Sequence, residues 1–209
     1  ALADLDPFDA TVLGFAGRDH LPTEQQAAEA AARAALYRDT RRELDPHLDH
    51  EDEAQAFAAQ EIAGWLDTRI KEDDSAMWSW DLNHIHSPFQ WVSDVFDVMD
   101  KDTKDGWDDV QARLDAIPFM LEGYMQSLSV GVGNGQVQAR RQVESVLEQA
   151  SHAAGPESRL LAFPDEAERA GADRRAVESA VATAMEACGR FAGFLRDTVF
   201  PAAPEADGV

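Results

Sequence analysis

The sequence predicts an all-α protein, a bundle or array of about eight or nine helices with no substantial sheet. Apolar residues recur at three- and four-residue steps through most of the chain, and helix-starting and helix-ending residues separate these segments. No segment shows the strict alternation of a strand, and no composition shift marks a linker. Residues 1–209 are therefore expected to form a single all-α unit.

Composition and charge restrict the classes of function. The 209 residues are 44% hydrophobic and 28% charged, which is ordinary for a globular protein with a buried core. The 40 acidic and 18 basic residues give a formal net charge of −22. This argues against nucleic-acid and anionic-membrane partners, because both are recognised through basic patches. No signal peptide and no apolar run of ~20 residues is visible, so a cytoplasmic location is expected.

The first part of the chain predicts a short helix followed by a long one. Asp6 begins the short helix as its N-cap, and Gly14 ends it in the left-handed conformation. A T-x-x-Q signature at Thr23 opens an Ala-rich helix that extends to about Leu44. Pro46 is expected to end this helix, because proline removes a helical hydrogen bond.

The next helix is expected to begin with Asp49 or His50 as its cap and to end before a polar turn over residues 71–75. Its apolar residues predict a wide buried stripe. The stripe contains Ala54, Phe57, Ala58, Ile62, Trp65, Leu66 and Ile70.

The aromatic segment 76–128 is expected to hold the centre of the core, because it contains four of the five tryptophans. Ser87 and the proline after it predict a helix start, and Thr103 or Asp105 predicts another. Pro118 predicts a break or a new first turn. The apolar positions expected on these helices are Phe89, Val92, Val95, Phe96, Met99, Trp107, Val110, Leu114, Ile117, Leu121, Tyr124, Met125 and Leu128.

The last part of the chain predicts a Gly-rich turn over 131–135, a helix over 137–153, and one short helical turn within 160–171. Asp173 caps a final long helix. Cys188 in this helix is the single cysteine of the chain, which excludes a disulfide within the chain. It is interpreted as a buried structural thiol. The apolar positions of this helix are Val177, Val181, Ala184, Cys188, Phe191, Leu195 and Val199.

Two acidic or histidine-rich segments resemble metal sites without completing them. The Asp100–Gly106 loop departs from the EF-hand pattern, because its fifth ligand position is Lys104 and its glycine falls at the seventh. Helix-capping acids in a solvated turn are the preferred interpretation. The H-x-x-H-E segment at His47 fits neither zinc-helix pattern and is interpreted as capping and surface polarity.

His84 and His86 lie two residues apart, so on an extended segment both rings point to one side. With Asp81 they form a weak candidate for a divalent site, although the sequence supplies no third strong ligand. The preferred interpretation is that they bond to helix ends or line a groove beside Trp78 and Trp80. Two later arginines, at 140 and 141, either pair with internal carboxylates or hold a substrate carboxylate.

Three segments resemble the bacterial DUF885 family. They are the opening LDPFDATVLGFAGRDHLPT, the central SPFQWVSDVFDVM with DGWDDVQARLDAIPFMLEGYMQSLSVGVGNGQVQARRQVESVLEQ, and the final FLRDTVFPAAPEADGV. The shared features are a tryptophan-containing helix start, an Arg-Leu…Ile-Pro pattern, and a Gly-rich turn before Arg140 or Arg141 and Gln149. The resemblance covers essentially the whole chain.

The resemblance implies an all-helical, zinc-metallopeptidase-like protein that carries H-E-x-x-H in its C-terminal half. This chain contains no H-E-x-x-H. We therefore expect an N-terminal portion of a longer protein or one half of a split protein, inactive alone, with no cofactor of its own. Zinc is implied for the missing half. That half, or an equivalent chain, is the expected partner, and a peptide is the expected substrate.

In this interpretation the chain forms one wall of the substrate groove, and its acidic surface suits peptides with a free amino group or basic side chains. The alternative is a non-catalytic helical module for partner binding or dimerisation. Its docking face would be the final helix, at Phe191, Leu195 and Val199. The groove candidates are Trp78, Trp80, His84, His86, Gln90, Tyr124 and Arg140.

Overall fold

The computed structural model describes residues 2–15, 17–21 and 27–205, and within these ranges it contains helices and no strand. The all-α prediction is confirmed. Eight of the described α-helices have six or more residues, which agrees with the expected number. The α-helices are α1 (Leu2–Leu5), α2 (Pro7–Val12), α3 (Ala27–Leu44), α4 (Glu53–Asp74), α5 (Pro88–Asp94), α6 (Lys104–Gly133), α7 (Arg140–Ala153), α8 (Phe163–Arg169), α9 (Arg174–Phe194) and α10 (Phe200–Ala202).

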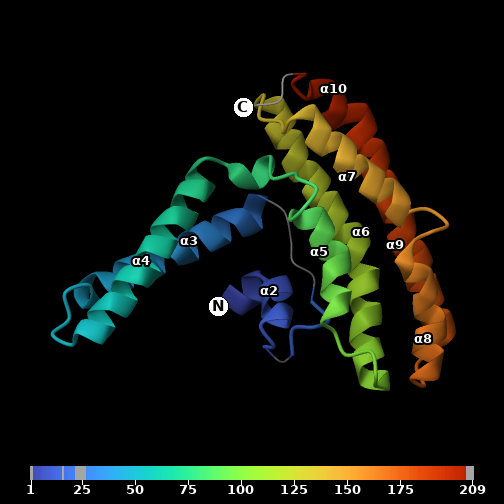
Figure 1. Ribbon diagram of the computed structural model, residues 1–209, viewed down its shortest axis with the longest axis horizontal. Coiled ribbons are helices and arrows are strands. Elements are labelled where there is room, and N and C mark those ends of the chain that lie inside the picture. Colours follow the sequence, from blue (N-terminus) through green and yellow to red (C-terminus); the bar gives the residue numbers. More distant parts are fainter. Residues whose placement is uncertain (1, 16, 22–26, 206–209) are drawn as a thin grey trace.

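The long helices α6 and α9 form the axis of the molecule and make its most extensive helix–helix contact. Helices α7 and α8 also pack against α9, and α5 lies alongside α6 (Figure 1). A π-helical turn, Leu195–Val199, connects α9 to α10. No helix in the described ranges is long and apolar enough to cross a membrane.

Aromatic rings connect the helices of this bundle. Phe191 of α9 stacks on Phe89 of α5 at 5.2 Å and on Tyr124 of α6 at 5.3 Å between ring centroids. Farther along, Phe163 meets Phe96 and Trp107 edge to face. Such pairs add to the free energy gained from burial alone. The expected core is therefore confirmed, although Trp107 is the only one of the segment's four tryptophans that the described structure buries fully.

The expected break at Pro118 is wrong, since α6 continues through it from Lys104 to Gly133. An internal proline costs about 3 kcal/mol through its missing hydrogen bond and its ring clash. The neighbouring side chains of Leu114, Ile117 and Leu121 are each at most 1% exposed. Packing of both halves of α6 against the bundle outweighs the local cost.

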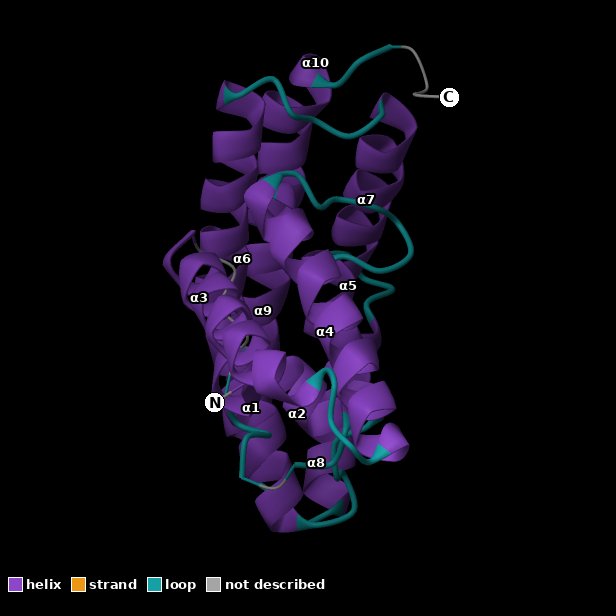
Figure 2. Ribbon diagram, turned by 90° about the vertical axis from the view of Figure 1, so that its left-hand side faces the viewer, coloured by secondary structure: helices purple, strands orange, loops and turns teal. Residues whose placement is uncertain are grey.

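Helices α3 and α4 form a hairpin that extends away from the bundle in Figure 1 and lies in front of it in Figure 2. Small side chains line the contact between them, which lets the two backbones approach closely. The buried residues of the pair are Ala30, Ala34, Ala59, Ala63 and Leu66. The expected apolar stripe of α4 is therefore largely wrong: Phe57 is 64% exposed, Ile62 48% and Trp65 45%.

Several helix limits differ from those expected. Asp52, rather than Asp49 or His50, caps α4 by accepting from the backbone N–H groups of Ala54 and Gln55. The expected polar turn at 71–75 is wrong, because α4 continues to Asp74. The start predicted at Thr23 lies outside the described residues.

Most other expected helix ends are confirmed. Asp6, Thr103 and Asp173 accept backbone N–H groups as N-caps of α2, α6 and α9. The backbone N–H of Ser87 donates to the Gln90 side chain as part of a capping box on α5. The helix predicted over 137–153 begins three residues later, at Arg140.

The last helix does not offer the docking face expected in the alternative function. Phe191, Leu195 and Val199 are at most 2% exposed, because α6 and α7 cover this side of α9 and its π-helical extension. A surface for a partner therefore does not lie at these three residues.

A buried arginine fastens the N-terminal segment to the bundle. Arg113 of α6 is 2% exposed. Its Nε donates to the Asp19 carbonyl at 2.5 Å, and its Nη2 lies within hydrogen-bond distance of Pro7 O, Thr11 Oγ1 and Arg18 O. Burial lowers the pKa of Arg113 to about 10, which leaves the guanidinium protonated at neutral pH. One buried cation thus ties three backbone carbonyls of the N-terminal segment to α6.

We predict that Arg113→Ala lowers the free energy of unfolding by about 3 kcal/mol, because it removes the buried donor to the Asp19 carbonyl and to Thr11 Oγ1 and unfastens the N-terminal segment from α6. The matched control is Arg190→Ala, which removes an exposed pair with Glu186 on α9 and should cost no more than ~0.5 kcal/mol. Urea unfolding followed by circular dichroism measures both. Equal effects of the two variants would contradict the role given to Arg113.

Gly131 is required where α6 passes the turn that follows α4. A Cβ at this position would lie 2.2 Å from the backbone oxygen of Ser79, whereas a Cβ at Gly133 would meet nothing within 4 Å. We predict that Gly131→Ala destabilises by roughly 2 kcal/mol through this clash, and that Gly133→Ala is neutral or stabilises by about 0.5 kcal/mol. Thermal melts of the two variants test this. A Gly131→Ala variant as stable as Gly133→Ala would show that the contact is not tight.

Candidate functional site

Two cavities lie on different sides of α5. The first, the hairpin cleft, has a volume of about 380 Å³ and lies between the α3–α4 hairpin and the bundle. The second, the bundle cavity, has a volume of about 500 Å³ and lies between α5, the α7–α8 connection and α9. Both volumes fall in the range of small-molecule sites.

The hairpin cleft combines aromatic rings with many charged groups. The rings of Tyr37 and Trp65 meet edge to face, with their centroids 5.5 Å apart. The Arg69 guanidinium carbon lies over the Trp65 ring, 5.5 Å from its centroid. His86 lies against Trp91 at the same separation. The full lining is Asp6, Asp9, Arg33, Tyr37, Trp65, Arg69, Glu72, Asp73, Met77, Trp78, Asp81, Asn83, His86 and Trp91.

Three polar atoms that are buried in the walls of this cleft have no hydrogen-bond partner among the described residues. They are Arg33 Nη1, Asp73 Oδ2 and Trp91 Nε1. Buried polar groups are nearly always paired, so each such atom calls for an explanation. A zwitterionic or polar ligand would supply hydrogen-bond partners for these three atoms, which belong to a cation, an anion and a neutral donor.

Burial raises the pKa of Asp73, and the nearby positive charge of Arg33 opposes that rise. Burial also raises the pKa of Asp81, opposed by a hydrogen bond from Asn83 and by His86. Raised carboxyl pKa values in a cleft mark carboxylates that lack the solvation or partners they need. A ligand cation would supply that partner.

The loop 81–87 sets one wall of the cleft and is held on both sides. Asn83 Oδ1 accepts the backbone N–H groups of Ile85 and His86, which makes the loop turn. On the far side, Gln149 of α7 donates to the carbonyl of His84. The loop is therefore fixed between the hairpin cleft and α7.

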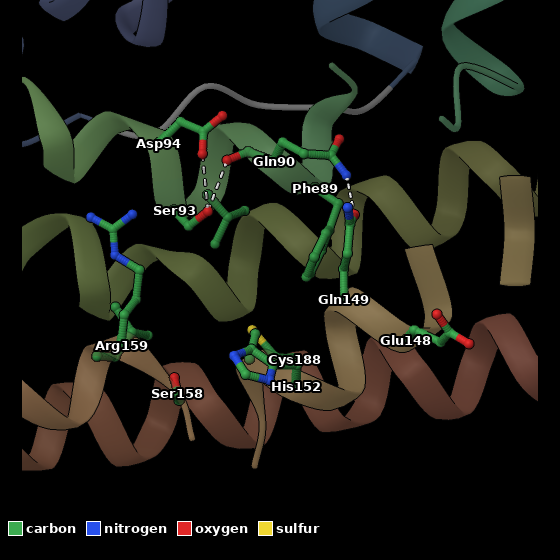
Figure 3. A pocket seen from close by; sticks show the side chains of 13 residues that line it. Phe89, Gln90, Ser93, Asp94, Glu148, Gln149, His152, Ser158, Arg159 and Cys188 are labelled. Atoms are coloured by element: carbon green, nitrogen blue, oxygen red, sulfur yellow. Dashed lines mark hydrogen bonds between the residues drawn. The ribbon is translucent and has the colours of Figure 1, made fainter. Parts of the chain in front are cut away.

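The bundle cavity has an apolar floor and a polar rim (Figure 3). Phe89, Val92, Leu160 and Cys188 contribute to the floor. Burial raises the pKa of Cys188 to about 11, so its thiol is neutral and unreactive at neutral pH. The expectation of a buried structural thiol is confirmed. The polar side chains of the lining are Gln90, Ser93, Asp94, Glu148, Gln149, His152, Ser158 and Arg159.

The structure brings only three of the seven predicted groove residues to a cavity. Trp78 and His86 line the hairpin cleft, and Gln90 lines the bundle cavity. Trp80 and His84 line neither. The carbonyl of Trp80 accepts from Gln138, and the ring of His84 bonds through Nδ1 to Gln142 at 2.7 Å. Of the two interpretations of His84, a hydrogen bond at a helix end or a place in a groove, the structure shows a hydrogen bond in the first turn of α7.

The other two predicted residues have structural contacts. Tyr124 is buried at 1% exposure, and its hydroxyl donates to the carbonyl of Asp81 at 2.5 Å. Arg140 lies over the ring of Phe200 at 5.0 Å and pairs with Glu205 at 3.5 Å. Internal pairing, one of the two alternatives for this arginine, is what the structure shows.

Sequence reasoning missed the hairpin's contribution to the cleft, although a signal was present. Trp65, Arg69 and Asp73 recur at four-residue steps, so they share one face of α4. That face was expected to be part of a buried apolar stripe. Sequence reasoning also missed Ser158 of the bundle cavity. This residue lies in the α7–α8 connection, where the sequence contains no recognisable motif.

The described residues do not fit a metal centre. They contain no group of three or more His, Cys, Asp or Glu side chains placed to hold an ion. In the calcium-like loop, the Asp100 carboxylate accepts from the Thr103 hydroxyl and from the backbone N–H of Asp102. Asp100 thus orders the start of α6, as the capping interpretation predicts.

The raised pKa of Asp81 gives a pH-dependent prediction. The stabilising contribution of protonated Asp81 is fully present below its ordinary pKa of 3.8. This contribution is lost as the pH rises through the higher pKa of the folded state. Asp81→Asn, which stays neutral, should therefore melt at a higher temperature than the wild type at neutral pH. This advantage should vanish well below pH 3.8.

Thermal melts across the acidic and neutral range measure this difference. The matched control, Asp115→Asn, removes a carboxylate on an exposed face of α6 and should raise the melting temperature at neutral pH less than Asp81→Asn does. A lower melting temperature for Asp81→Asn at neutral pH would show that the carboxylate contributes contacts that outweigh its burial.

Comparison with known proteins agrees with the resemblance seen in the sequence. No curated protein matches the chain. The family described as "Bacterial protein of unknown function (DUF885)" matches residues 7–209, which is nearly the whole chain and includes every lining residue of the two cavities except Asp6. The protein therefore belongs to the DUF885 family.

Proposed function

We propose that this chain is the substrate-binding wall of a zinc-dependent, peptidase-like hydrolase, and that the hairpin cleft binds the free amino end of a peptide. The observation that carries the proposal is the set of unpaired buried atoms in this cleft, Asp73 Oδ2, Arg33 Nη1 and Trp91 Nε1. A peptide end offers partners for all three, because it contains an ammonium group, a carbonyl and further backbone polar atoms.

Charge favours the amino end. Five carboxylates line the cleft against two guanidinium groups, and one of those, Arg69, already donates to Glu72 at 2.7 Å. In this assignment the ligand ammonium pairs with Asp73, and its first carbonyl accepts from Arg33. Trp78 and Trp91 supply aromatic surface for the cation and for the first side chain.

Zinc and its general base are not assigned to this chain, because the described residues do not fit a metal centre. In the proposal, an H-E-x-x-H segment outside this sequence, in the same protein or in an equivalent chain, holds the ion. When bound, zinc would polarise the scissile carbonyl and activate a water molecule. The residues of this chain bind and orient the peptide.

Binding can be measured without the catalytic segment. We predict that a short peptide with a free amino terminus binds the purified chain, and that its N-acetylated form binds much more weakly. Asp73→Asn should weaken binding of the free peptide by roughly ten- to a hundredfold, because it removes a charge-assisted hydrogen bond. Isothermal titration calorimetry measures both peptides.

The neighbouring Asp74 provides the matched control. It pairs with Arg38 at 2.6 Å and does not line the cleft, so Asp74→Asn should leave peptide affinity unchanged. Equal binding of the free and acetylated peptides, or equal effects of the two substitutions, would refute the assignment of the amino end to Asp73.

Hydrolysis tests the wider proposal. The chain is produced together with an H-E-x-x-H-bearing segment of a DUF885 protein, and peptide cleavage is assayed with and without a chelator. The expected result is chelator-sensitive cleavage whose KM rises in Asp73→Asn. Absent or chelator-insensitive cleavage would refute the peptidase function, even if the cleft binds peptides.

A further inference from the structure

We propose that the bundle cavity is a second binding site, which takes a small neutral molecule with an apolar body and one carbonyl group. It is separated from the hairpin cleft by α5, and no residue lines both cavities. The proposal does not depend on peptide hydrolysis. It rests on the size of the cavity, its apolar floor and the hydrogen-bonding groups of its wall.

The floor suits an aromatic or branched aliphatic group. Phe89, Leu160 and Cys188 are each at most 6% exposed, and they close the inner end of a space of about 500 Å³. Apolar lining with a few convergent polar groups is the usual composition of small-molecule sites. Asp94 and Glu148 are the two carboxylates of the lining, and both are exposed to solvent (Figure 3).

A buried hydroxyl in the wall lacks a partner. Ser158 is 5% exposed, and its Oγ has no hydrogen-bond partner among the described residues. Serine hydroxyls in protein interiors are normally bonded, often to their own backbone. Ser158 lines the cavity, so a ligand atom in the cavity can form the hydrogen bond that this hydroxyl lacks.

Two glutamines of the lining form a chain of hydrogen bonds beside the floor. Gln90 Oε1 already accepts the backbone N–H of Ser87, and Gln90 Nε2 donates to Gln149 Oε1 at 2.7 Å. Gln149 Nε2 donates in turn to the carbonyl of His84. Each amide keeps a second N–H, since the group has two. Together with the Ser158 hydroxyl, these N–H groups can donate to a ligand acceptor, and a carbonyl is a neutral group that only accepts.

Charge at the rim disfavours ionic ligands. The guanidinium of Arg159 is already engaged by both carboxylate oxygens of Asp97. Asp94 and Glu148 then leave the opening negative, which repels anions. A cation would have to lose its hydration over the apolar floor, where the described residues place no carboxylate. A neutral ligand avoids both costs.

Four probes with the same phenylalkyl body test the head group. They are 4-phenylbutan-2-one, butylbenzene, 4-phenylbutanoate and 4-phenylbutylamine, and ligand-observed NMR titration gives their affinities. The expected result is that the ketone binds most tightly, roughly threefold to tenfold better than butylbenzene, which is what one net hydrogen bond supplies. The two ions should bind more weakly than the ketone.

Substitutions place the binding in this cavity. Ser158→Ala should remove most of the advantage of the ketone over butylbenzene, whereas Ser151→Ala, on the exposed side of α7, should not change it. Ala153→Leu should fill the cavity and weaken all probes, while Trp78→Ala in the hairpin cleft should leave them unchanged. Thermal melts confirm that each variant is folded.

The proposal is overturned if no probe binds, or if the carboxylate or the amine binds as tightly as the ketone. It is also overturned if Ser158→Ala leaves the preference for the ketone intact, or if Trp78→Ala rather than Ala153→Leu weakens binding. None of these outcomes bears on the amino-end assignment at Asp73, whose probes are charged peptides.

Discussion

The structure depends on the position of Tyr124, the buried side chain at which its parts meet. The ring stacks on Phe191 of α9, which in turn stacks on Phe89 of α5, so three helices share one aromatic contact. The hydroxyl donates to the carbonyl of Asp81 and fixes the start of the loop that leads into α5. Burial raises the pKa of Tyr124 well above its ordinary value, so it remains a donor at neutral pH. Both cavities take their shape from this arrangement, since Phe89 lines one and Asp81 the other.

The two cavities differ in polarity because different interactions build their walls. The bundle cavity lies between helices that pack through large apolar side chains, so its floor is apolar. The hairpin joins its helices through alanines and through exposed ion pairs such as Arg38–Asp74. Its remaining aromatic and charged residues therefore face outward or into the cleft. Desolvated carboxylates there reduce stability, which is a common property of residues kept for binding.

Local sequence signals predicted the bundle well and the hairpin poorly. Strong caps at Asp6, Thr103 and Asp173, together with dense apolar periodicity, specified where α2, α6 and α9 begin, because capping and burial favour the same structure there. In α4, periodicity alone did not show which face would be covered, since alanines rather than Phe57 and Trp65 form the contact. Of the seven residues expected in a groove, most instead hold helices together. Aromatic and polar side chains serve both purposes, and their type does not distinguish the two.

By itself, the sequence determined the helical fold, the aromatic centre of the core, the buried thiol and membership of the family. These depend on patterns within a few turns of helix or on similarity along the whole chain. Only the tertiary structure decided that α6 continues through Pro118, that Arg113 binds the N-terminal carbonyls, and which polar atoms remain unpaired in the cavities. The physical reason is that burial and hydrogen-bond satisfaction are set by residues far apart in sequence, and no local pattern records which of them will meet.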